Sequence, residues 1–130
     1  MILDRESFIA SFPVDAGEAS VLKRGTRVKF LSTNGVVGIA TAGADDLAIG
    51  VIERDWNPST DSGAPAEGAS VRLFGYPRTF IAASAIADAT QLTPVAAGKV
   101  DNGIGYPYVT FKGAGADGEQ VVGYKVETVS

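Results

Sequence analysis

The chain of 130 residues contains no histidine and no cysteine. These absences exclude histidine-dependent catalytic triads, thiol nucleophiles and the zinc, iron–sulfur and copper sites that need histidine or cysteine ligands. Catalysis by carboxylates or lysine alone stays open, but the commonest general acid–base group is missing. We therefore expect a protein that is not an enzyme, with no catalytic residues, no cofactor and no bound metal.

Positive charge is scarce as well. The chain has 11 basic and 15 acidic residues, a net charge of −4, and its basic residues are scattered. Nucleic-acid binding relies on clustered lysine and arginine, so no nucleic acid is expected as a partner. The sequence also lacks a long apolar run, and Asp4 and Glu6 stand where a signal peptide carries basic residues. We expect no membrane association, and synthesis in a cytoplasm.

Glycine, in contrast, is abundant, with sixteen residues, most of them at the expected turns. Residues 27–31 alternate polar and apolar, and Asn34-Gly35 is a favoured hairpin turn. Many short strands separated by such turns predict an all-β fold, a compact β-sandwich or barrel. At most two short helical segments are expected, near 4–11 and 84–90. The predicted strands are 27–31, 36–41, 47–54, 70–75, 78–83, 107–112 and 120–128.

The sequence partly repeats itself. Residues 42–53 read AGADDLAIGVIE and residues 114–127 read AGADGEQVVGYKVE, each with a central glycine, Gly50 or Gly123. Upstream of them lie Asn34-Gly35-Val36-Val37 and Ala97-Gly98-Lys99-Val100. This pattern predicts a duplicated strand–turn–strand unit that serves as scaffolding.

The first 22 residues differ from the rest. We expect an N-terminal arm over 1–22 and a single β domain over 23–130. Four large apolar residues precede the helix-breaking Pro13: Leu3, Phe8, Ile9 and Phe12. Either the arm docks on its own domain, or it binds these side chains to a partner.

Trp56, the only tryptophan, lies in a stretch rich in proline, serine and glycine over 55–69. It is either a lid on the core or an exposed anchor for a partner. Asp45-Asp46 and Asp117 lie in the repeated turns, where aspartate usually bonds its own backbone and where the spacing matches no calcium loop. Gly103-Ile104-Gly105 lacks the third glycine and the helix of a phosphate-binding loop.

The glycine and apolar pattern between residues 22 and 128 resembles the capsid decoration (cement) proteins of tailed bacteriophages. The resemblance implies a structural virion protein on the outer surface of the capsid. It would form a homotrimer at threefold or quasi-threefold positions and clamp neighbouring subunits of the major capsid protein. The apolar arm and Trp56, which lie outside the segments that carry the resemblance, are the candidate surfaces for the capsid contact. The segments that carry the resemblance are 25–28, 34–37, 45–51, 69–75, 82–87, 98–100 and 122–124.

Two alternatives remain. One is a β module of a phage tail, baseplate or fibre, whose composition would be the same. The other is a β barrel that binds a small ligand or carbohydrate, for which aromatic side chains would have to converge in a groove. The candidates for that groove are Trp56, Tyr76, Tyr106 and Tyr108.

Overall fold

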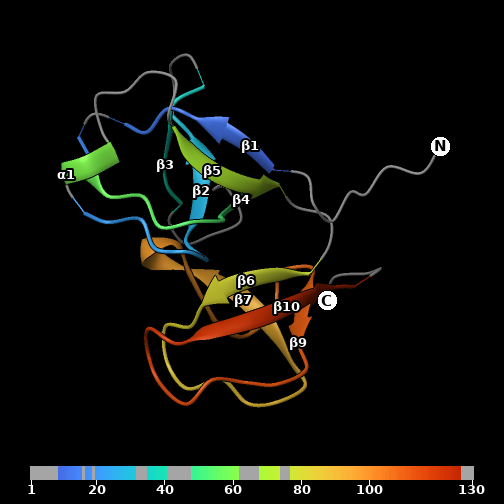
Figure 1. Cartoon of the computed structure of the whole chain (residues 1–130). Helices are drawn as coiled ribbons and strands as arrows, with labels where there is room; N and C mark the ends of the chain where they lie inside the picture. The colour runs from blue at the N-terminus through green and yellow to red at the C-terminus, as the bar shows by residue number, and fades with distance from the viewer. Residues whose placement is uncertain are drawn as a thin grey trace.

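The computed structural model describes residues 9–15, 17–18, 20–31, 35–40, 48–61, 68–73 and 77–126. Within them, ten strands form two antiparallel five-stranded sheets (Figure 1). The chain completes the first sheet before it begins the second, and each sheet curls around its own hydrophobic core. The all-β prediction is confirmed.

The first sheet has the strand order β1-β5-β4-β2-β3. Its side chains alternate as the sequence pattern predicts: Val28 and Val71 are fully buried in the core, while Arg72, the next residue after Val71 in β5, lies on the other face. A one-turn helix, α1 (Pro58–Asp61), follows β4. The strands are β1 (Ile9–Phe12), β2 (Arg27–Phe30), β3 (Val37–Ile39), β4 (Ala48–Ile52) and β5 (Ala69–Leu73).

The second sheet has the order β6-β10-β9-β7-β8. Phe80, Leu92 and Tyr108 form its core together with Val121. A short 3₁₀ turn, η2 (Ala96–Gly98), joins β7 to β8. The strands are β6 (Arg78–Ile81), β7 (Thr90–Val95), β8 (Lys99–Asn102), β9 (Tyr108–Thr110) and β10 (Gln120–Lys125).

The two sheets have the same topology. Replacing β1–β5 by β6–β10 in chain order converts the first strand order into the second. We call residues 9–73 the first repeat and residues 77–126 the second repeat. In each, one parallel bridge joins the residues just after the first edge strand to the other edge strand, Val14 to Val37 and Ala82 to Val100. The edges meet through these single bridges, so the sheets do not form the closed barrel that the sequence left open.

The strand registers also match between the repeats. Arg27 pairs with Val51 as Gln91 pairs with Val109. Val51 then pairs with Arg72, as Val109 pairs with Tyr124. Outside the strands, Leu22 and Trp56 exchange two backbone hydrogen bonds, and Ile86 and Ala114 do the same. The chain is therefore a tandem duplication of one five-stranded unit.

Backbone conformation is preserved at two turns. Gly35 and Gly98 have φ angles of 69° and 71° at equivalent hairpin positions. Gly25 and its counterpart Ala89 both have positive φ, 98° and 52°. The second pair shows that the unit keeps the left-handed turn even where glycine has been lost.

The duplication predicted from sequence is half correct. The segments 34–37 and 97–100 are structural counterparts, since Val37 and Val100 hold the same bridge position. The segments 42–53 and 114–127 are not, because they end in β4 and β10, which occupy different places in their sheets. The central glycine of each segment allows a different close contact. A Cβ on Gly50 would collide with the Arg72 carbonyl oxygen, and one on Gly123 would lie 2.6 Å from the Phe80 ring.

Two further expectations need correction. Residues 9–22, expected in an arm outside the domain, belong to the first repeat wherever they are described: β1 pairs with β5, and Leu22 is fully buried. The helix expected near 4–11 is a strand from Ile9 onward, and the one near 84–90 is a series of bends and a bridge. Ala89 with its positive φ cannot continue a right-handed helix.

Candidate interaction surfaces

The junction between the repeats is built on a buried arginine. Arg27 points from β2 into the second repeat and is 1% exposed. Its Nε donates to the Lys99 carbonyl oxygen (3.2 Å), and Nη2 donates to that of Val95 (2.8 Å). The guanidinium lies 5.6 Å from the centre of the Tyr106 ring. A desolvated cation held by carbonyl dipoles and an aromatic face fixes one repeat on the other.

Close backbone contacts complete the junction. A Cβ on Gly98 would lie 2.7 Å from Thr26 Cγ2, and one on Gly25 would lie 3.1 Å from the backbone of Phe80. Gln120 Nε2 donates to the Arg24 carbonyl oxygen (3.1 Å). A hollow of about 350 Å³ opens beside these contacts. It is lined from both repeats by Val21, Leu22, Lys23, Thr26, Ile39, Ile81, Ala97, Lys99 and Gly118.

A charged pair borders the junction on the first repeat. Arg72 donates from Nε and Nη2 to the two carboxylate oxygens of Glu53, at 2.7 and 3.2 Å. Arg24 stands 3.9 Å from the same carboxylate. The Arg72 hydrogen bond holds the pKa of Glu53 below its ordinary value.

The N-terminal residues predicted to bind the capsid fall into two groups. Leu3 and Phe8 lie outside the described residues. Ile9 is 40% exposed on the edge strand β1, and the Phe12 ring packs edge-to-face on Phe30, with 5.2 Å between centroids. Of these, Ile9 offers apolar surface to a partner, whereas Phe12 packs against the first core.

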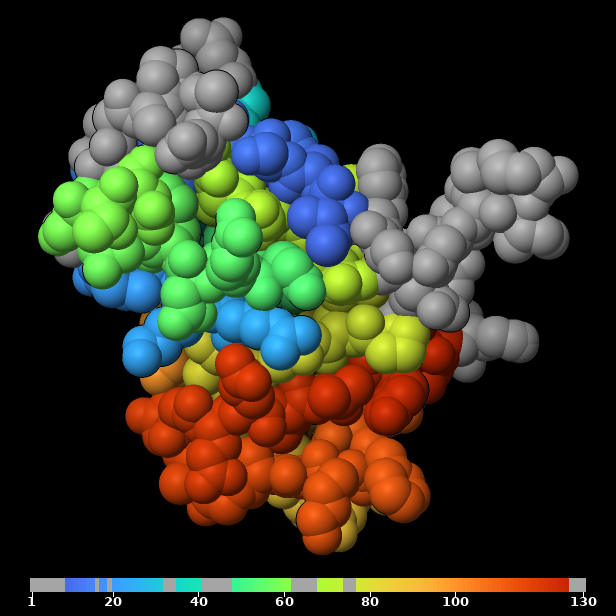
Figure 2. Space-filling model, viewed as in Figure 1, coloured from blue at the N-terminus to red at the C-terminus, as the bar shows by residue number. Residues whose placement is uncertain are grey.

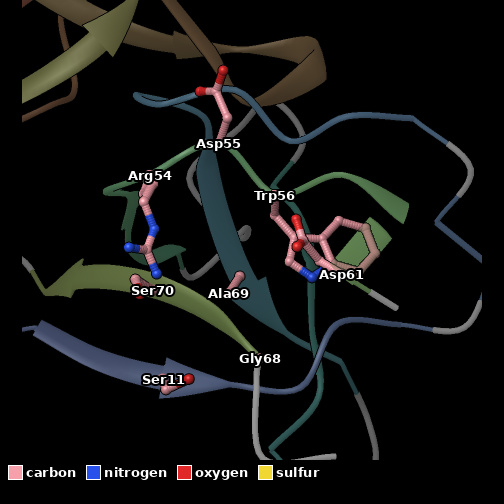
Figure 3. Close-up of a pocket in the computed structure, with 8 residues that line it drawn as sticks. All are labelled: Ser11, Arg54, Asp55, Trp56, Asp61, Gly68, Ala69 and Ser70. Atoms are coloured by element: carbon pink, nitrogen blue, oxygen red, sulfur yellow. The ribbon is translucent and has the colours of Figure 1, made fainter. Parts of the chain in front are cut away.

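Trp56 is 6% exposed and belongs to the first core, so the structure favours its interpretation as a lid. It backs a polar hollow of about 470 Å³ (Figure 3). The carboxylates around this hollow already have partners: Asp55 accepts from the Arg24 amide and Asp61 from the Asn57 amide, both at 2.7 Å. They stabilise the loop and α1. The other lining residues are Ser11, Arg54, Gly68, Ala69 and Ser70.

An exposed apolar face was missed by the sequence analysis. Strand β10 carries apolar residues on both sides: Val121 faces the core, while Val122 and Tyr124 are 41% and 46% exposed. Phe111, just after β9, is 78% exposed. Figure 2 shows β10 in red across the surface of the second repeat. Two adjacent apolar residues in one strand, Val121-Val122, were the available signal. We call Gln91, Val109, Phe111, Val122 and Tyr124 the outer face.

The remaining motifs have structural roles. Asp117 forms an ion pair with Lys99 (2.8 Å), and Asp45-Asp46 lie outside the described residues. Gly103 and Gly105 belong to the loop before β9, and no helix follows them. The described residues contain no group of three acidic side chains that could hold a metal ion. Within the same residues, no helix has the length and apolar character to cross a membrane.

The aromatic residues proposed for a ligand groove do not converge. Tyr106 and Tyr108 pack on each other and on Phe80 in the second repeat, with ring centroids 5.1 to 5.7 Å apart. Trp56 lies in the core of the first repeat, and Tyr76 lies outside the described residues. Among the described aromatics, no groove exists for the ligand-binding alternative.

Comparison with known proteins finds a similarity among solved structures. No protein-family model matches the chain, and no curated protein matches it. Among solved structures, the chain is similar to the N base of the head fiber gp8.5 of bacteriophage phi29, with a TM-score of 0.63. The two share 16% identity over 95% of this chain and 98% of that chain. The likeness thus shows a shared fold that includes both repeats.

Proposed function

We propose that this chain is a structural protein of a tailed-bacteriophage head. The observation that carries the proposal is the fold likeness to the phi29 head fiber base, which extends over nearly all of both chains. The sequence pattern, which resembles capsid decoration proteins, supports the same virion location. The role requires a stable scaffold and no catalytic group or cofactor.

In its finer form, the proposal places the protein on the outer surface of the capsid as a homotrimer. There it clamps neighbouring subunits of the major capsid protein. Clamping buries additional area across joints that internal DNA pressure would otherwise open. A symmetric trimer makes each weak contact three times, which multiplies the effective affinity.

The test is binding of the purified chain to isolated heads that lack it. We expect the chain to sediment with the heads, and electron microscopy to show compact threefold density on their outer surface. Binding of the chain to shells assembled from the major capsid protein alone would support the clamp. Absence of binding to heads, or binding to tails alone, would overturn the proposal.

The likeness also favours a second candidate, the base of a head appendage, because the similar structure is the base of a fiber. A decoration protein ends as a compact knob on the shell, whereas a base carries a projecting filament. Microscopy of complete virions separates the two candidates, since only the second predicts continuous density that extends outward from each knob.

A further inference from the structure

The contact between the two repeats is head-to-tail, because it uses a different surface of each. The first repeat contributes the start of β2 and the outward side of β4, where Val51 is 1% exposed and joins the core of the second repeat. The second repeat contributes β6 and the Gly98 turn. We call the surface of the first repeat the face of the junction, and the surface of the second repeat its seam.

Because the repeats are equivalent, each chain has one further face and one further seam that its own junction leaves unused. The unused face is the outer face of the second repeat, where Gln91, Val109 and Tyr124 correspond to Arg27, Val51 and Arg72. The unused seam is β1 with the Gly35 turn, which correspond to β6 and the Gly98 turn.

The unused face carries exposed apolar side chains where the face of the first repeat carries polar ones. Where the first repeat has Glu53 and Arg72, the second has Phe111 and Tyr124, which are 78% and 46% exposed. Ser70 is likewise replaced by Val122. Apolar side chains gathered on one face of a sheet mark an interaction site.

The unused seam is correspondingly open. A Cβ on Gly98 would meet Thr26 and Arg27, but no atom of the described residues lies within 4 Å of one built on Gly35. Ile9, on the adjoining strand β1, is 40% exposed. The Gly35 turn therefore has the backbone shape of the Gly98 turn and the free space that a partner would fill.

We infer that a second copy of this chain covers the outer face, with its Gly35 turn and β1 placed as the Gly98 turn and β6 are placed inside one chain. Such a contact is heterologous, so successive copies join head to tail, and they close into a ring where the rotation from one copy to the next divides a full turn. The number of copies rests on the proposed function: a trimer would form a ring of six repeats joined by one kind of contact.

Engineered cysteines test this geometry without background, because the chain has none of its own. Within one chain, Thr26 and Gly98 are in contact. The equivalent positions across two chains are Thr90 and Gly35. We therefore expect T26C/G98C to form a disulfide inside each chain, as the matched control. Gly35→Cys mixed with Thr90→Cys should form linked dimers of one chain of each kind, and G35C/T90C should form linked trimers.

Neither single variant should form dimers alone, because a head-to-tail contact brings different positions together. Dimers of Gly35→Cys alone would indicate a twofold contact and overturn the inference. So would a complete lack of linkage between chains that still sediment as trimers, although the proposed trimer would then stand. Chains that are monomeric both free and on heads would overturn the trimer and the ring together.

A second measurement avoids any change at Gly35. Phe111→Asp places a charge in the proposed contact, whereas Ala116→Asp places one in the exposed loop that corresponds to α1. Both should keep the far-ultraviolet circular dichroism of the parent chain. We expect Phe111→Asp to raise the dissociation constant of the assembly at least tenfold in sedimentation, with Ala116→Asp unchanged. Equal behaviour of the two variants would contradict the inference.

Discussion

Two buried arginines, Arg27 and Arg78, differ in how their polar atoms are used. Both are 1% exposed. Arg27 donates to two carbonyl oxygens of the other repeat. Arg78 donates from Nη1 to the neighbouring Pro77, and its Nε has no hydrogen-bond partner among the described residues. Burial accordingly lowers the pKa of Arg78.

We therefore expect the same substitution to affect stability much more at Arg27 than at Arg78. Arg27→Met should lower the free energy of unfolding by about 2–3 kcal/mol, because it removes the hydrogen bonds from the guanidinium to two carbonyl oxygens of the other repeat. Arg78→Met should change it by less than about 1 kcal/mol, since the lost charge was poorly compensated. Urea unfolding of both variants measures the difference. A larger loss for Arg78→Met would contradict this account.

Glu53 should make stability depend on pH. Its pKa in the folded protein is lowered from the ordinary 4.5 by the Arg72 hydrogen bond. A lowered pKa means that the stabilisation is fully present above pH 4.5 and is lost as the pH falls through the folded-state value. Glu53→Gln should cost about 1 kcal/mol at neutral pH and weaken the decline in stability below pH 4.5. Thermal melts across that range measure both effects, and Arg72→Met with the double variant shows whether the pair is responsible.

At the scale of the elements, the two hairpin turns form a matched pair. Gly98→Ala and Gly35→Ala impose the same left-handed strain, about 1 kcal/mol, at φ angles of 71° and 69°. Only the Gly98 variant also pushes a methyl group against Thr26 and Arg27. We expect it to cost about 1–3 kcal/mol more. Thermal unfolding in the Phe111→Asp background, where assembly is expected to be weakened, measures the difference. Equal losses would mean that the junction can shift to accept the methyl group.

A substitution in the turn before β7 should increase the stability of the fold. Ala89 has a φ of 52°, where its counterpart Gly25 has 98°. Ala89→Gly should raise the free energy of unfolding by up to about 1 kcal/mol, because relief of strain exceeds the greater freedom of glycine in the unfolded chain. Ala87→Gly, at a position without positive φ, should instead be destabilising. Melting temperatures of the two variants decide the matter, and a loss in both would contradict it.

For the whole molecule, the shared junction predicts cooperative unfolding. Val51 belongs to the core of the second repeat although it lies in a strand of the first. Trp56, the only tryptophan, reports on the first repeat. In the parent chain, its fluorescence and the far-ultraviolet circular dichroism should change together in urea. In Arg27→Met the two curves should separate, because the repeats lose a shared contact. Curves that stay coincident would show that Arg27 does not couple them.

Local patterns in the sequence predicted most strands but not which strands pair with each other. Alternation identified β2, and the Asn34-Gly35 signal identified the turn before β3. Strand β7 was missed because helix formers precede it and Pro94 lies inside it. The proline is tolerated because β9 pairs only with Thr90 and Gln91, which leaves Pro94 one neighbouring strand.

The candidate sites were harder to predict, because they depend on contacts between distant residues. Trp56 was correctly placed in a loop region, but its burial follows from the two backbone bonds to Leu22. The junction at Arg27 joins residues about seventy positions apart. The duplication itself was visible only at 34–37 and 97–100, since the alike counterparts elsewhere are scattered, as Val51 and Val109 are, and lie among pairs that share no chemistry, such as Glu53 and Phe111.

The assignment of each sheet to one half of the chain has a consequence during synthesis. The first repeat can pair all its strands once residue 73 has left the ribosome, with no contribution from later residues to its strand ladder. Until the second half emerges, Val51 and Arg27 remain exposed to water, as the interface residues of an unassembled subunit are. Because strand pairing stays within each half, the first half can fold as a unit during synthesis, and arrival of the second half then covers the exposed site.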